Sequence, residues 1–124
     1  MHERTLYYLQ RMHDLCVDIQ NFIDGIELED FLQDKRTQNA VAMSLLALGE
    51  VANSIHQKDA EFVEQNPKIA WKPMRGMRNI IEHGYFDLDF VVIYETASQF
   101  IPPLQNQLMD LINHFRQPET ESSS

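Results

Sequence analysis

Hydrophobic residues recur at steps of three and four along the first half of the chain, the spacing that lines one face of an α-helix. The first stripe predicts a long helix from about Thr5 to Asp24-Gly25 and consists of Leu9, Met12, Cys16, Ile19 and Ile23. The second predicts a long helix from about Arg36 to His56 and consists of Val41, Leu45, Leu48, Ala52 and Ile55. Thr5 can cap the first helix, and Gly25 can supply the permissive backbone on which helices often end.

Shorter segments separate and follow these two helices. A helical turn is expected at 28–32. A short helix capped by Asp59 should end at Asn66-Pro67, because the residue before proline avoids the helical region. A third helix is expected to begin near Lys72-Pro73, since proline is tolerated in a first turn, and to end at Gly84.

The last predicted helix starts at Asp87 or Asp89, either of which can cap it. Its apolar stripe consists of Val92, Ile93, Thr96, Phe100, Leu104, Leu108, Leu111 and Phe115. Residues 90–94 are rich in β-forming side chains, but the stripe continues beyond them with helical spacing, so a helix is favoured over a strand. Pro102-Pro103 lies inside the stripe and predicts a kink.

These patterns predict an all-α protein, an up-and-down bundle of four to five helices in a single domain over residues 1–116. The polar residues 117–124 are expected to form a disordered tail. With 124 residues and 44% hydrophobic content, the chain has material for one core but too little for two independent domains. Leu and Met residues outside the main stripes indicate an oligomer.

Composition favours a soluble, cytoplasmic protein without a membrane partner. No apolar run approaches the roughly 18 residues that a membrane span needs, and the first residues lack the layout of a signal peptide. The single cysteine, Cys16, falls at a helical-core position, which favours a buried thiol over a nucleophile. The histidines outside residues 68–83 are scattered without metal-ligand spacing, so we expect neither a metal site nor a cofactor.

The net charge of -9 argues at first against a nucleic-acid ligand, because phosphate contacts supply much of that affinity. The charge is unevenly distributed, however. Residues 68–83 carry a net +3, so the rest of the chain carries -12. This segment can bind RNA or a nucleotide, with Lys72 and Arg75 as RNA-binding candidates, or its cations can simply offset acidic neighbours. Charge alone leaves both interpretations open.

The same segment contains residues suited to phosphodiester chemistry. The guanidinium of Arg78 can hold a phosphate in a planar fork, and the imidazole of His83 can move protons near neutral pH. Five helical positions separate them by about 140°, so they flank a groove and do not form a tight pair. Asn79 is four residues from His83 and can orient the imidazole or contact a phosphate oxygen. Gly84 can end the helix and turn Tyr85 back.

Taken alone, Arg78 is more often a surface ion-pair residue and His83 a locally satisfied helix-end histidine. The surrounding pattern favours a functional interpretation: Arg78-Asn79-x3-His83-x-Tyr85 resembles the motif of the HEPN superfamily, and within it that of the HepT toxin branch. Two further segments resemble that branch, Gly49-Glu50-Val51-Ala52 and Pro102-Pro103-Leu104. The resemblance covers most of the chain.

The resemblance implies an all-α homodimer in which the motif helices of two chains face each other and form a composite cleft that cleaves RNA without a metal ion. Arg78 and His83 would be catalytic, and Asn79 would support them. Tyr85 would be the hydroxyl that an MntA-like nucleotidyltransferase antitoxin modifies with AMP. The chain would then be the toxin endoribonuclease of a type VII-like toxin-antitoxin pair, in a homodimer or a larger hetero-oligomer.

A second hypothesis keeps the same residues without the chemistry. A non-catalytic accessory module could use the cleft between Arg78 and His83 to bind a nucleotide or to dock a nucleotidyltransferase, with catalysis only in the partner. For the enzyme, the single motif histidine predicts an obligate dimer, because attack by the ribose 2'-OH needs both a base and an acid.

Overall fold

A computed structural model describes residues 3–116, and this part of the chain is helical without any β-strand. The predicted all-α bundle is therefore confirmed. Three of the main helices are α1 (Glu3–Ile23), α3 (Lys35–Lys58) and α5 (Trp71–Gly84), and the fourth arm of the bundle ends in α7 (Ile101–Arg116). The predicted tail, 117–124, lies outside the described residues.

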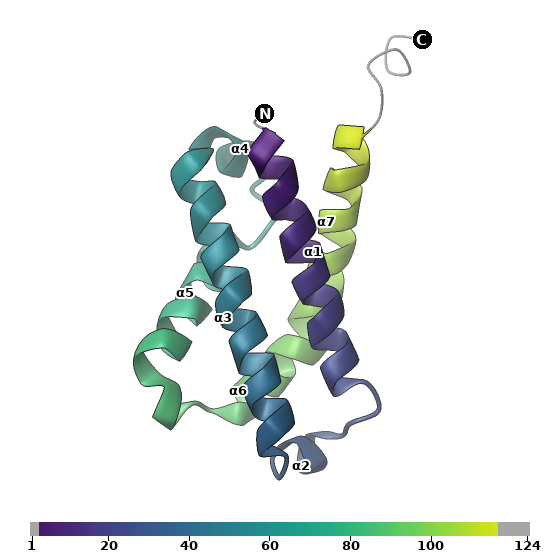
Figure 1. Ribbon diagram of the computed structural model, residues 1–124, viewed down its shortest axis with the longest axis vertical. Helices are drawn as coiled ribbons and strands as arrows, with labels where there is room; N and C mark the ends of the chain where they lie inside the picture. Colours follow the sequence, from purple (N-terminus) through teal and green to yellow (C-terminus); the bar gives the residue numbers. More distant parts are fainter. Residues whose placement is uncertain (1–2, 117–124) are drawn as a thin grey trace.

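The α3 helix lies between the other main helices. It packs against α1 on one side and α5 on the other, while α7 runs beside α1 (Figure 1). The start of α1 and the end of α7 lie at the same end of the bundle (Figure 1). Because α3 contacts both α1 and α5, its residues can link the core to any site carried by α5.

The first connection follows the sequence pattern with one correction. Gly25 ends α1 with a φ of +73°, which is the left-handed conformation that glycine adopts without steric cost. Thr5, however, does not cap the helix, because α1 already begins at Glu3. The buried hydroxyl of Thr5 instead donates a hydrogen bond to Asp59 Oδ2 at 2.7 Å, so it ties the start of α1 to the end of α3.

Side-chain caps define the helices that flank α3. The helix itself extends slightly beyond the predicted 36–56 at both ends, and Asp34 caps it by accepting from the Thr37 N–H at 3.1 Å. A short helix, α2 (Leu28–Phe31), precedes it at the predicted turn. After it, Asp59 caps α4 (Ala60–Gln65) by accepting from the Phe62 N–H at 3.4 Å, as the sequence predicts.

The chain after α5 forms a segmented helical arm. A 3-10 turn, η1 (Tyr85–Asp87), follows directly, and Asp89 then caps α6 (Phe90–Glu95). A π-helical turn, η2 (Thr96–Phe100), connects α6 to α7. The sequence predicts a kink at Pro102-Pro103, and the structure instead has a π-helical turn just before these prolines. The prolines lack the N–H groups that would bond to carbonyls one turn earlier, which frees the backbone there for the wider π turn.

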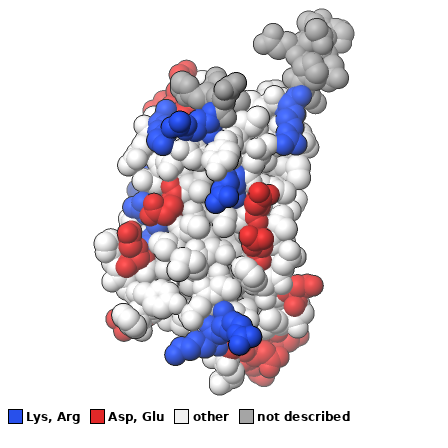
Figure 2. All heavy atoms as spheres, viewed as in Figure 1, with Lys and Arg blue, Asp and Glu red and all other residues white. Residues whose placement is uncertain are grey.

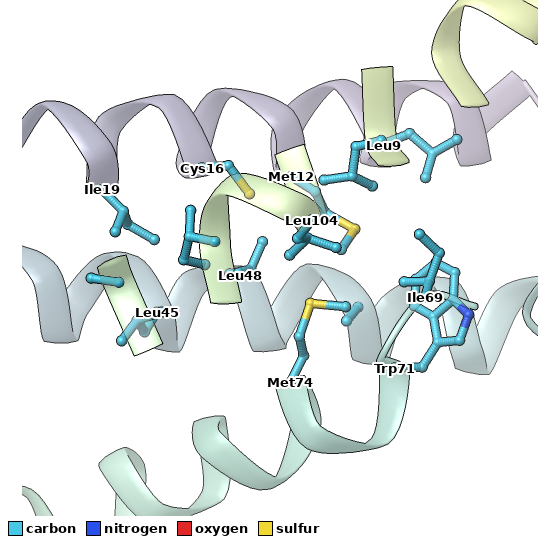
Figure 3. Close-up of a cluster of buried hydrophobic side chains, with 14 of the residues drawn as sticks. Leu9, Met12, Cys16, Ile19, Leu45, Leu48, Ile69, Trp71, Met74 and Leu104 are labelled. Carbon is cyan, nitrogen blue, oxygen red and sulfur yellow. The ribbon is translucent and has the colours of Figure 1, made fainter. Parts of the chain in front are cut away.

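Buried apolar side chains from all the main helices form one core (Figure 3). Trp71, Met74 and Ile81 are the residues through which α5 joins it. Trp71 also donates from Nε1 to the Asn66 carbonyl at 3.0 Å, which fixes the first turn of α5. Burying side chains of this size stabilises the fold by about 1.5–3 kcal/mol each. One face of α5 is thereby anchored, and the other is left outside the core.

Cys16 is fully buried in this core, as predicted, and points inward from α1 (Figure 3). Burial raises the pKa of its thiol to about 12, because the charged thiolate is poorly solvated there. The thiol therefore stays protonated and unreactive at neutral pH. None of the described helices combines the length and apolar character needed to cross a membrane.

Candidate active site

The α5 helix presents its candidate residues on two different faces. Arg78 lies against α3 with its side chain only 20% exposed, whereas His83 is on the outer face with its side chain 78% exposed. This divergence agrees with the angle of about 140° predicted from their spacing. Within the described chain no hydrogen bond links the two side chains, so one protomer does not by itself bring them together.

Two residues hold the guanidinium of Arg78. Its Nη1 donates to Glu50 Oε1 on α3 at 3.3 Å. Its Nε and Nη2 both donate to Asn79 Oδ1, at 3.2 Å and 2.8 Å. The group is thus bonded along two of its edges, by a carboxylate from another helix and by its own neighbour.

Asn79 does not orient His83, which is one of the two roles that its spacing allows. The amide oxygen accepts from Arg78, and no hydrogen bond to His83 is formed within residues 3–116. Asn79 therefore supports the arginine and leaves the imidazole without orientation from this side chain. Its two amide N–H groups remain available to a ligand, because a side-chain amide carries donor and acceptor on different atoms.

A close approach of α3 and α5 sets the position of the Arg78 stem. A Cβ atom added to Gly49 would lie 2.5 Å from Arg78 Cβ and 2.6 Å from the Met74 carbonyl oxygen. No side chain larger than hydrogen fits there without moving backbone. Gly49 and Glu50 are consecutive, so the same turn of α3 contacts both the stem and the head of the arginine.

His83 has few intramolecular constraints. Its Nε2 lies 4.0 Å from Glu82 Oε2, and both side chains are well exposed. An exposed pair at this distance contributes little to orientation or stability. The imidazole is therefore free to contact a second molecule.

Tyr85 turns back towards α3, as the position of Gly84 permits. Its hydroxyl donates to Asn39 Oδ1 at 2.5 Å, although the residue remains exposed. The neighbouring Phe86 ring is almost fully exposed and meets the Tyr85 ring edge-on at 6.0 Å between centroids. Asn39 and Glu50 are eleven positions apart, about 16 Å along α3, so Arg78 and Tyr85 rest on different turns of the same helix.

Comparison with known proteins matches residues 12–111 to a family described as ribonuclease HepT-like. The chain belongs to this HepT-like family. It is 35% identical over 104 residues to a Thermococcus cleftensis protein named "Probable ribonuclease HepT", covering 84% of this chain and 92% of the relative. It is 31% identical over 105 residues to a Caldanaerobacter subterraneus protein named "Putative RNase TTE0752", covering 85% and 91%. No solved structure gives a significant match.

Because the family is described as ribonuclease HepT-like, the positions of the cations bear on whether this chain can bind RNA. Lys72 is exposed on the first turn of α5, but Arg75 is partly buried, and its Nε has no partner among residues 3–116. Basic and acidic side chains are interspersed over the face shown in Figure 2. Of the two RNA-binding candidates, Lys72 is the more exposed, and the role of both stays a prediction.

Sequence patterns missed Glu50 and Asn39, the two α3 residues that hold the candidate side chains. Neither could be assigned from spacing, because each bonds to a residue far along the chain. For Glu50 the signal was the resemblance of residues 49–52 to the HepT branch, without a role attached. No group of three or more potential metal-ligating side chains is found in the part that the structure describes.

Proposed function

We propose that this HepT-like ribonuclease is a metal-independent endoribonuclease whose active site is completed by a second copy of the chain, and that it acts as a toxin. The observation that carries the proposal is the division of α5 into two faces. Arg78 is held against α3, while His83 extends from the outer face, where residues 3–116 leave its side chain largely exposed.

The proposed chemistry is a transesterification. The ribose 2'-oxygen attacks the adjacent phosphorus, its proton passes to one imidazole, and the bond to the 5'-oxygen breaks as a second imidazole protonates that oxygen. The products are a 2',3'-cyclic phosphate and a free 5'-hydroxyl. Arg78 would bind the non-bridging oxygens as negative charge accumulates on them. With one His83 in each chain, two chains supply the base and the acid.

The outer face of α5 has the character expected of a contact surface between copies. Ile80 on this face is 60% exposed, and Phe86 just beyond the helix is almost fully exposed. Gly76 also lies on this face, and a Cβ atom added to it would meet nothing within 4 Å in the part of the chain that the structure describes. Exposed apolar side chains that lie together are typical of surfaces that another molecule covers, and a glycine beside them lets that molecule approach the helix backbone.

Control of the toxin is proposed to act through Tyr85. An MntA-like nucleotidyltransferase antitoxin would transfer AMP from ATP to the exposed hydroxyl, releasing pyrophosphate. The added group is bulky and negatively charged, and it would stand two residues from His83, where it repels RNA phosphates. The proposed partners are RNA and the nucleotidyltransferase. The protein would act in the cytoplasm, as a homodimer or as part of a larger hetero-oligomer.

Cleavage of RNA in the presence of a chelator tests the catalytic proposal. We expect Arg78→Ala and His83→Ala to lower the cleavage rate by about a hundredfold or more, which is typical for loss of a charge-stabilising group or a general acid-base. The matched controls are Arg116→Ala and His114→Ala at the end of α7, which should cleave at the wild-type rate. Equal background cleavage by all five proteins would contradict an enzymatic role.

Intact-mass measurement tests the control proposal. Incubation with the partner nucleotidyltransferase and ATP should add the mass of one or more AMP groups to the wild type, and Tyr85→Phe should remain unmodified. Absence of any mass increase in the wild type would argue against modification. If AMP transfer occurs but no RNA is cleaved before it, the non-catalytic docking module becomes the better description.

A further inference from the structure

Glu50 is the one carboxylate that contacts the candidate catalytic arginine in the described chain. Its Oε1 lies 3.3 Å from Arg78 Nη1, which is longer than the 2.7–2.9 Å of a strong charge-assisted hydrogen bond. The Glu50 side chain is 53% exposed, so water and salt screen the pair. Such a contact adds little to the stability of the fold. Its effect should therefore be on the orientation of the guanidinium.

Counting the donors of Arg78 shows what this orientation achieves. A guanidinium carries five N–H groups, one on Nε and two on each terminal nitrogen. One on Nε and one on Nη2 bond to Asn79, and one on Nη1 bonds to Glu50. One N–H on each terminal nitrogen is left without a partner among residues 3–116. A pair of donors on the two terminal nitrogens can make a bidentate contact with a phosphate.

The stem of the arginine is fixed by the residue before Glu50. Gly49 meets Arg78 so closely that even a methyl group would lie 2.5 Å from Arg78 Cβ. The long arginine side chain normally loses substantial rotamer freedom when it binds a ligand. Here Gly49 restricts the stem of the Arg78 side chain and Glu50 restricts its guanidinium. Asn79 adds a third contact, also to the guanidinium.

We infer that Glu50 is a positioning residue for RNA cleavage: it holds the Arg78 guanidinium so that its two remaining terminal N–H groups stay available as a fork for the scissile phosphate. This inference rests on the proposed ribonuclease function. A rival explanation predicts the opposite effect on the cleavage rate: the Glu50 carboxylate would compete with RNA phosphate for Arg78 and slow the enzyme.

Two substitutions distinguish these two explanations. Glu50→Gln removes the charge but keeps an oxygen that can accept from Nη1, whereas Glu50→Ala removes both. We expect Glu50→Ala to lower kcat about ten- to hundredfold with little change in KM, because misplacement of a transition-state contact affects the chemical step. Glu50→Gln should keep kcat within about threefold of the wild type. Glu64→Ala, which removes an exposed carboxylate from α4, controls for the change in net charge.

The outcomes are distinct. A wild-type kcat in Glu50→Ala would overturn the positioning role, as would a lowered KM and a raised kcat/KM in both Glu50 variants, which competition predicts. Urea unfolding of each variant identifies losses that come only from a destabilised fold. A kcat that falls in Glu50→Ala and is not retained by Gln would show that charge, and not orientation, is what matters.

A second measurement does not depend on cleavage. In nuclear magnetic resonance spectra, restricted rotation of the Arg78 guanidinium should give separate Nη1 and Nη2 signals in the wild type and in Glu50→Gln, assigned by their loss in Arg78→Ala. Glu50→Ala should exchange them faster. Fast exchange in the wild type would overturn the inference. If the guanidinium is ordered but no RNA is cleaved, the positioning stands and the ribonuclease proposal fails.

Discussion

The two faces of α5 differ in how completely the chain itself satisfies them. The inner face carries the buried Met74 and the Arg78 stem, which meets Gly49 at a distance that excludes any side chain there. The outer face carries Ile80 and His83, which are largely exposed, and Gly76, where an added Cβ atom would meet no other side chain or helix within 4 Å among residues 3–116. One face is determined within the protomer. The other has few contacts within residues 3–116 and is proposed to meet a second molecule.

This difference explains why the motif is divided between the faces. Holding Arg78 in place requires rigid neighbours. The α3 helix provides them, because at Gly49 its backbone packs directly against α5. In the proposed mechanism His83 must reach the substrate to move protons, and a buried imidazole could not do so. Two glycines make the contrast testable, because the same substitution is expected to act with opposite signs on the two faces.

Gly49→Ala should have the largest effect on stability. The new methyl group would meet the Met74 carbonyl oxygen at 2.6 Å, and a backbone atom in a helix cannot move away cheaply. We expect a loss of about 1–3 kcal/mol in the free energy of unfolding, measured by urea denaturation. Unchanged stability would mean that α3 and α5 are not in this close contact.

Gly76→Ala should have a smaller effect of the opposite sign. Alanine in a helix interior is favoured over glycine by about 0.5–1 kcal/mol, and the added methyl group would meet nothing within 4 Å among residues 3–116. We expect the protomer to become more stable by that amount while self-association, measured by sedimentation, becomes weaker. A more stable variant that still associates like the wild type would show that the outer face is not where copies approach closely.

The smallest effect on stability is expected for the contact that Tyr85, just after the end of α5, makes with α3. The Tyr85 hydroxyl donates to Asn39 Oδ1, and net contributions of such bonds lie near 1 kcal/mol or below. A double-mutant cycle of Tyr85→Phe and Asn39→Ala, measured by urea denaturation, should give a coupling of about 0.5 kcal/mol. Additive effects would mean that Tyr85 is not held on α3.

Much of the fold follows from the order of residue types along the chain. The stripes from Leu9 and from Val41 predict α1 and α3, since a helix that hides one face from water needs apolar residues at that spacing. Gly25 and Asp59 mark helix boundaries because their backbone or side-chain chemistry is local. Thr5 was assigned a local role and has a distant one, because a buried hydroxyl takes whichever partner the packing brings near.

Only part of the candidate site could be predicted from the sequence. The angle between Arg78 and His83 is a property of helical geometry, so the sequence predicts it, and the structure agrees. The partners of Arg78 and Tyr85 are not predictable from spacing, because Glu50 and Asn39 meet them across a helix-helix contact. Burial of the Arg75 Nε was not predictable for the same reason, since it depends on how α5 packs.

The sequence by itself determined which residues can carry chemistry and on which faces of a helix they lie, because both depend on composition and on a fixed helical period. Only the tertiary structure decided which of those faces is held and which is open. That outcome depends on how closely α3 and α5 approach, and the approach is set by a glycine on one helix meeting an arginine on the other.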